Sequence, residues 1–95
     1  MESLDTLRGM PNIVMYTSPV CPYCIRAKRL LDAKGVEYEE RMLDLSPESR
    51  QQLVDLTGRY TVPQILIDDT PVGGFDEISA LDRAGELDEL LGLSA

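Results

Sequence analysis

Cys21 and Cys24 are the two cysteines of this chain, and two residues, Pro22 and Tyr23, separate them. A C-x-x-C pair at the junction of a strand and a helix is typical of thiol–disulfide exchange. Pro22 suits the first position of a helix, so Cys21 becomes the N-cap and its sulfur faces the free backbone N–H groups of Tyr23 and Cys24. Such donors, together with the helix dipole, lower a cysteine pKa from about 8.5 into the range of about 3.5–7.5. We therefore predict that Cys21 is the attacking thiol.

Cys24 lies one helical turn further along, on the same face, where it can reach the Cys21 sulfur and resolve a mixed disulfide. Three other interpretations of the pair are weaker. A structural disulfide across so short a loop contributes only about 2 kcal/mol. A zinc site needs four ligands, and the chain has two cysteines and no histidine. Two buried cysteines that act as small apolar residues would leave the intervening proline and tyrosine unexplained.

The elements that must position this pair can be predicted from apolar patterning and turn residues. Strands are predicted at residues 12–16, 36–43, 64–67 and 71–72. Helices are predicted at residues 22–33, 47–57 and 75–91, the last with an interruption near Gly85. Gly35 and Gly58 are expected to end the first two helices, and Ser46 is the expected N-cap of the second.

This order, β-α-β-α-β-β-α, defines an α/β chain. Two strands joined by a crossover helix run parallel, whereas the last two, joined by a short polar turn, run antiparallel. The result is a four-stranded mixed sheet flanked by helices, which matches the thioredoxin-like fold. We expect one domain at residues 12–92, preceded by an N-terminal extension at residues 1–11.

The charge of the chain excludes several functions. With 9 basic and 17 acidic residues the net charge is -8, which repels nucleic acid and anionic membrane surfaces. The first residues are acidic where an export signal is basic, and no apolar run is long enough to cross a membrane. We expect a cytoplasmic protein, in a compartment where structural disulfides are rare.

Three motifs, in this order, resemble the dithiol glutaredoxins, most closely the short bacterial members: Cys21-Pro22-Tyr23-Cys24, Thr61-Val62-Pro63 and Gly73-Gly74-Phe75-Asp76-Glu77. The likeness covers residues 13–91. It implies an enzyme that reduces protein disulfides and glutathione mixed disulfides through Cys21 and Cys24, with glutathione as electron donor and no metal. It also implies a monomer whose substrates are disulfide-containing or glutathionylated proteins, with ribonucleotide reductase among the family's partners.

The resemblance implies a set of glutathione-binding residues: Tyr23, Arg59, Thr61, Val62, Pro63, Gly74, Phe75 and Asp76. Pro63 is implied to be cis, and the backbone of the residue before it to pair with glutathione. The γ-glutamyl end of glutathione is a zwitterion, which suits the start of a helix that bears an acid. Backbone N–H groups of Phe75 and Asp76 can take the carboxylate, and the Asp76 side chain the ammonium. Arg59 is either a partner of the glycine carboxylate or a solvated loop residue.

Ser18 departs from the family pattern, because many members have a lysine at this place. A cation that would contact glutathione is therefore missing, and we expect the position to be open to solvent. Two other functions share the cysteine motif. One is a thioredoxin-like donor served by a flavoprotein reductase, and the other is a carrier of a glutathione-ligated iron–sulfur cluster held between two subunits.

Overall fold

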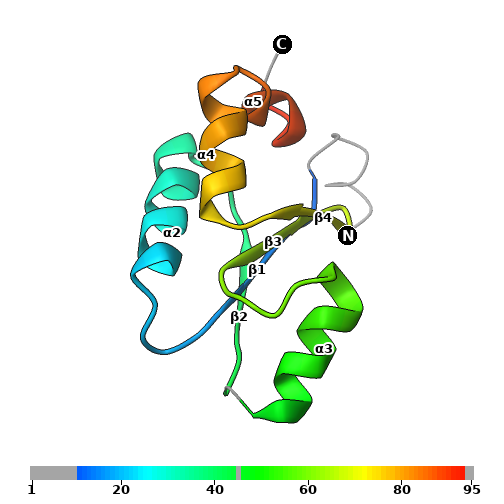
Figure 1. Cartoon of the computed structure of the whole chain (residues 1–95). Helices are drawn as coiled ribbons and strands as arrows, with labels where there is room; N and C mark the ends of the chain where they lie inside the picture. Colours follow the sequence, from blue (N-terminus) through cyan, green and yellow to red (C-terminus); the bar gives the residue numbers. More distant parts are fainter. Residues whose placement is uncertain (1–10, 45, 94–95) are drawn as a thin grey trace, which may run out of the picture.

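The structure is a computed structural model that describes residues 11–44 and 46–93. Its centre is a four-stranded sheet with the order β2-β1-β3-β4 (Figure 1). The strands are β1 (Ile13–Thr17), β2 (Glu39–Met42), β3 (Gln64–Ile67) and β4 (Thr70–Gly73). The helices are α2 (Pro22–Lys34), α3 (Pro47–Thr57), α4 (Phe75–Arg83) and α5 (Leu87–Leu90).

The sheet is mixed, as the sequence predicts: β1 pairs parallel with β2 and antiparallel with β3, and β3 pairs antiparallel with β4. All five residues of β1 are buried, since this central strand is covered on both faces. Its side chains alternate between the two faces. Ile13 and Met15 point to one core cluster, and Val14 and Tyr16 to the other.

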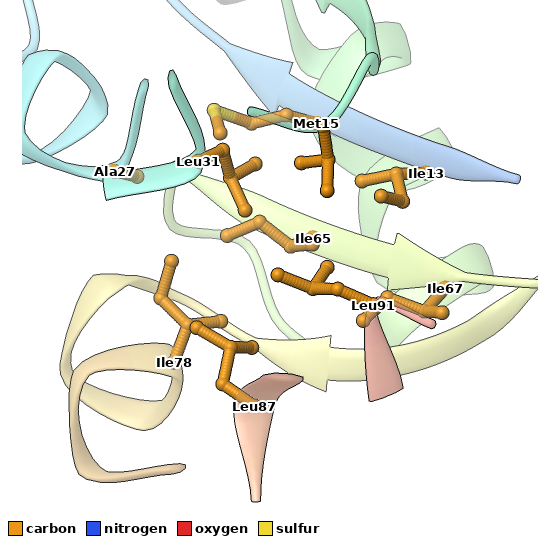
Figure 2. Close-up of a cluster of buried hydrophobic side chains, with 10 residues drawn as sticks. Ile13, Met15, Ala27, Leu31, Ile65, Ile67, Ile78, Leu87 and Leu91 are labelled. Carbon is orange, nitrogen blue, oxygen red and sulfur yellow. The ribbon is translucent and has the colours of Figure 1, made fainter. Parts of the chain in front are cut away.

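The larger core cluster lies between the sheet and the helices α2, α4 and α5. Figure 2 shows Met15 and Ile65 of the sheet meeting Leu31 of α2 and Ile78 of α4, and all four are fully buried. The smaller cluster lies on the opposite face, where Leu53 of α3 packs against the sheet. Figure 1 shows the same division, with α2 and α4 on one side of the sheet and α3 on the other. Because β1 ends at Thr17 and α2 begins at Pro22, a short segment that contains Cys21 joins the two.

Local signals account for the helix ends. Gly35 and Gly58 end α2 and α3 in the left-handed region, with φ of 75° and 78°, which glycine adopts without steric cost. Ser46 caps α3 by accepting a hydrogen bond from the Ser49 backbone N–H at 3.1 Å. The predicted interruption near Gly85 is confirmed, because α4 ends at Arg83 and α5 begins at Leu87.

Several predicted boundaries shift, two of them for a clear physical reason. The strand predicted at residues 36–43 is limited to β2, because only this part runs beside β1. The polar turn predicted at residues 68–70 consists of Asp68 and Asp69, both at positive φ, and Thr70 already belongs to β4. Such a two-residue turn matches the twist of a hairpin. In the described part of the chain no helix is long and apolar enough to cross a membrane. The division into residues 1–11 and 12–92 stays a prediction, since residues 1–10 lie outside the described ones.

Candidate active site at the start of helix α2

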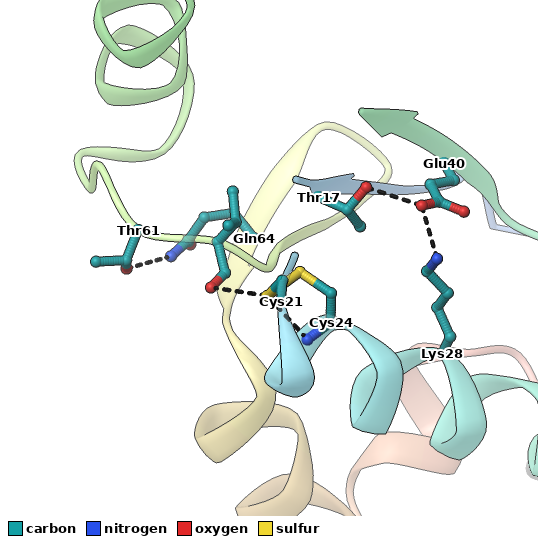
Figure 3. Close-up of a disulfide and its surroundings, with 8 residues drawn as sticks. Thr17, Cys21, Cys24, Lys28, Glu40, Thr61 and Gln64 are labelled. Atoms are coloured by element: carbon teal, nitrogen blue, oxygen red, sulfur yellow. Dashed lines mark hydrogen bonds and ion pairs between the residues drawn. A yellow bond between two sulfur atoms is a disulfide. The ribbon is translucent and has the colours of Figure 1, made fainter. Parts of the chain in front are cut away.

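Cys21 is the N-cap of α2, as predicted, and forms a disulfide with Cys24 (Figure 3). The backbone N–H of Cys24 donates a hydrogen bond to the Cys21 sulfur at 3.1 Å. The second donor that we expected, the N–H of Tyr23, makes no hydrogen bond to this sulfur among the described residues. Cys21 is half-buried and Cys24 is 2% exposed, so a substrate reaches the first sulfur more readily than the second.

The loop before β3 faces the disulfide. The Val62–Pro63 peptide bond is cis, which confirms what the resemblance implied. The carbonyl oxygen of Val62 lies 3.7 Å from the Cys21 sulfur, while the Val62 side chain packs against the smaller core cluster. The loop therefore brings backbone polar groups close to the reacting sulfur.

A groove of ≈ 160 Å³ opens beside the disulfide. Seven of the eight predicted glutathione-binding residues line it, and the eighth, Val62, lies next to two of them in the chain. Gln64 and Glu77 line the groove as well. The seven predicted residues are Tyr23, Arg59, Thr61, Pro63, Gly74, Phe75 and Asp76. Tyr23 and Phe75 form one wall, with ring centroids 6.3 Å apart. Residues far apart in the sequence thus meet in one site.

The glycine pair allows α4 to start close to the cis-proline loop. A Cβ at Gly74 would lie 2.9 Å from the carbonyl oxygen of Pro63, closer than real Cβ contacts. Gly73 has φ of 112°, and a Cβ there would lie 2.6 Å from the Cγ of Glu77. Both positions therefore require glycine, and Gly74, Phe75 and Asp76 at the start of α4 line the groove.

Glu77 is a site residue that the sequence analysis did not assign. One carboxylate oxygen accepts a hydrogen bond from the Gly74 N–H at 2.7 Å, and the other accepts one from Arg59 at 3.1 Å. The Gly74 N–H, and then Arg59, hold the pKa of Glu77 below its usual value. Its place three residues after the N-cap is the position of a capping glutamate, a signal that could have identified it.

Arg59 lines the groove but is paired with Glu77, so neither expectation for it is complete. It is not simply a solvated loop residue, and an anionic ligand would share it with a carboxylate. Gln64, also not assigned from the sequence, is 2% exposed, and its side-chain amide lies 3.4 Å from the Thr61 hydroxyl. Asp76 is exposed at the rim.

The expectation that Ser18 is open to solvent is wrong. Its exposed fraction is 8%, because it follows directly on the buried end of β1. A lysine here would have to extend its charged end from a packed position. The sequence pattern of a turn, Thr17-Ser18-Pro19, does not reveal this, since burial is set by the elements that pack around it.

To the right of the disulfide in Figure 3, a polar network links three elements. The Thr17 hydroxyl donates to Glu40 at 2.8 Å, and Lys28 of α2 pairs with the same oxygen at 2.8 Å. Lys28, and then Thr17, lower the pKa of Glu40. The network ties the end of β1 and the first half of α2 to β2, so it fixes the two ends of the segment that contains Cys21. Among the described residues no group of His, Cys, Asp or Glu is arranged to hold a metal ion.

A cysteine pair that begins a helix after the first strand of a mixed sheet, opposite a cis-proline loop, defines a thiol–disulfide oxidoreductase of the thioredoxin fold. The family model described as Glutaredoxin matches residues 13–72, so the chain belongs to the glutaredoxin family. It is 55% identical over 82 residues to a glutaredoxin of Pseudomonas aeruginosa, covering 86% of this chain and 98% of the relative. It is 48% identical to glutaredoxin 3 of Escherichia coli over 86% of this chain and 99% of the relative.

Solved structures agree. The solution structure of a glutaredoxin from Brucella melitensis is 45% identical, covers 88% of this chain and 91% of its own, and superposes with a TM-score of 0.77. A buckwheat glutaredoxin crystallised as a glutathione complex is 29% identical, with coverage of 96% and 86% and a TM-score of 0.78. The family predicted from the three motifs and the fold predicted from the order of helices and strands are confirmed.

Proposed function

We propose that this thiol–disulfide oxidoreductase uses glutathione as its electron donor and reduces both glutathione mixed disulfides and protein disulfides. The observation that carries the proposal is the groove beside Cys21, which combines an aromatic wall, a cis-proline loop and the start of α4. A donor served by a flavoprotein reductase would not need this groove. The related buckwheat protein, solved with glutathione, adds support.

The charged groups of the glutathione tripeptide have candidate partners along the groove. Its α-carboxylate suits the backbone N–H groups of Phe75 and Asp76, because the first N–H groups of a helix have no partner within it. Its α-ammonium suits the carboxylate of Asp76, which lines the groove. At the other end, Arg59 is the cation available to the glycine carboxylate, although it also pairs with Glu77.

The chemistry follows from the two sulfurs. The Cys21 thiolate attacks a glutathionylated protein at the glutathione sulfur, so a Cys21–glutathione disulfide forms and the protein leaves as a thiolate. A second glutathione thiolate attacks this disulfide, which releases oxidised glutathione and restores Cys21. With a protein disulfide, the Cys21 thiolate attacks one sulfur, so a Cys21–protein disulfide forms and the other protein sulfur leaves as a thiolate. The Cys24 thiolate then attacks Cys21, which releases the second protein thiolate and forms the Cys21–Cys24 disulfide. Two glutathione molecules reduce this disulfide and leave as oxidised glutathione.

The proposal is tested by comparing two electron donors in the same assay. The protein is supplied with a small mixed disulfide and either glutathione with its recycling reductase or a flavoprotein thioredoxin reductase, and NADPH consumption is followed. We expect turnover with glutathione and little with the flavoprotein donor. The reverse result would replace the proposal with the thioredoxin-like alternative. The compartment, the monomeric state and the protein substrates, ribonucleotide reductase among them, stay predictions.

A further inference from the structure

A second hollow, of ≈ 250 Å³, lies between α3 and the cis-proline loop. Apolar side chains form most of its wall: Leu43 after β2, Leu53 of α3, and Tyr60 and Val62 of the loop. Tyr60 is 68% exposed, which is unusual for a large aromatic side chain. No step of the chemistry described above uses this hollow.

The hollow shares residues of the cis-proline loop with the reacting site. Thr61 lines both the hollow and the glutathione groove. Val62 joins the hollow to the disulfide, because its side chain lines the hollow while its carbonyl oxygen lies 3.7 Å from the Cys21 sulfur. A polypeptide attached through its own cysteine to Cys21 therefore has two paths past the loop, one into the polar groove and one into the apolar hollow.

Size and charge indicate the occupant. Pockets that enclose drug-sized ligands have volumes of about 300–1,000 Å³, so a hollow of this size suits one amino-acid side chain better than a free metabolite. Among the described residues that line it, Arg50 carries the only charge, and its side chain is exposed. An acidic residue beside the apolar one would meet this guanidinium.

We propose that the hollow is a docking subsite for the protein substrate, which binds one large apolar side chain close in sequence to the target cysteine. Arg50 favours an acidic residue next to that side chain. The inference rests on the proposed function only in that the occupant is a protein thiol substrate, and it does not require glutathione to be the donor. It explains how the enzyme could distinguish protein cysteines that present the same reactive sulfur.

The test uses the fully reduced protein and a series of short peptides, each with one cysteine joined to 2-nitro-5-thiobenzoate. The Cys21 thiolate attacks the cysteine sulfur of the peptide, a Cys21–peptide disulfide forms, and the coloured thiobenzoate leaves. In a glycine- and serine-rich peptide, one leucine is moved through the two positions on either side of the cysteine. The second-order rate of colour release is measured for each peptide without glutathione, so its outcome is independent of the electron donor.

We expect leucine at one position to raise the rate about threefold to tenfold over serine at the same position, as partial burial of one leucine predicts. In Tyr60→Ser the ratio of the two rates should fall to about one, because the exposed wall of the hollow is removed. Leu56→Ser is the matched control. Leu56 is a 42% exposed residue of α3 that does not line the hollow, so the leucine preference should persist. An aspartate beside the leucine should add a preference that Arg50→Glu reverses.

Equal rates for leucine and serine at every position would overturn the proposal, as would a leucine preference that survives Tyr60→Ser. Sedimentation equilibrium of the parent and of Tyr60→Ser tests whether the hollow is instead occupied by another copy of this chain. A parent that dimerises and a variant that does not would assign the hollow to another copy of this chain and would equally overturn the proposal.

Discussion

At the scale of single residues, the two cysteines differ in access rather than in type. Cys21 is half-buried at the N-cap, and Cys24 is 2% exposed. We predict that Cys21→Ser abolishes all activity, whereas Cys24→Ser still reduces glutathione mixed disulfides and loses the reduction of protein disulfides. Paired assays with a glutathionylated peptide and with a protein disulfide measure the difference. Equal losses in both assays for both variants would contradict these roles.

The same N-cap position predicts the ionisation of Cys21. The Cys24 N–H donates to its sulfur at 3.1 Å, and the start of α2 adds the positive end of the helix dipole. Both favour the thiolate, so we expect its pKa to lie well below the ordinary value of about 8.5. The rate of iodoacetamide alkylation against pH, measured on Cys24→Ser, gives the midpoint. A midpoint at or above the ordinary value would show that the donors do not act on the sulfur.

Asp76 is the exposed carboxylate of the groove. Removing its charge in Asp76→Asn should weaken glutathione turnover about tenfold, near the lower end for a charge-assisted hydrogen bond of about 1.5–3 kcal/mol, because the site is open to solvent. Asp69→Asn is the matched control, since it removes a charge from the β3–β4 turn and asparagine tolerates positive φ. Glutathione dependence that is unaltered in Asp76→Asn would remove Asp76 from the binding site.

At the scale of elements, the sequence predicts what depends on neighbouring residues and misses what depends on distant ones. The N-cap role of Cys21 and the glycine ends of α2 and α3 follow from local backbone chemistry, and all are confirmed. The Arg59–Glu77 pair joins two segments 18 residues apart, so no local pattern reveals it. The burial of Ser18 likewise depends on what packs around the end of β1.

Glu77 stabilises the folded protein, because its carboxylate caps the start of α4. Its pKa is lowered in the folded protein, so its stabilising effect is present above the unfolded pKa of about 4.3 and is lost as the pH falls through the folded value. Glu77→Ala should therefore lower the melting temperature at neutral pH and flatten its decline in acid. With 39% of the side chain exposed, we expect a loss near 0.5 kcal/mol, roughly the lower end for a cap.

Thermal melts between about pH 3 and pH 7 measure this effect. Glu37→Ala is the matched control, since Glu37 is exposed and lies outside the helices and strands. Its melting curve should follow that of the parent at every pH. A Glu77→Ala variant whose melting temperature falls by the same amount in acid as at neutral pH would show that the ionised carboxylate is not what stabilises α4.

At the scale of the whole molecule, a net charge of -8 opposes the approach of glutathione, which is itself an anion. The burial of Ser18 decides where a compensating cation can be placed. Ser18→Lys would introduce a long side chain at a packed position, so we expect it to lower the melting temperature. Val20 is 89% exposed and precedes Cys21 directly, so Val20→Lys adds the same charge near the site without disturbing the core.

Val20→Lys should lower the glutathione concentration for half-maximal rate by at most several-fold, since an exposed ion pair is worth about 0.2–1 kcal/mol. The Debye length is about 10 Å at 0.1 M salt, so most of the gain should disappear as salt is added. Leu93→Lys, at another exposed position beyond α5, is the control for net charge alone. Because it adds an equal charge away from Cys21, it should give a smaller gain at low salt. If both variants lower the half-saturating concentration equally, the effect belongs to the field of the whole molecule and not to a contact at the site.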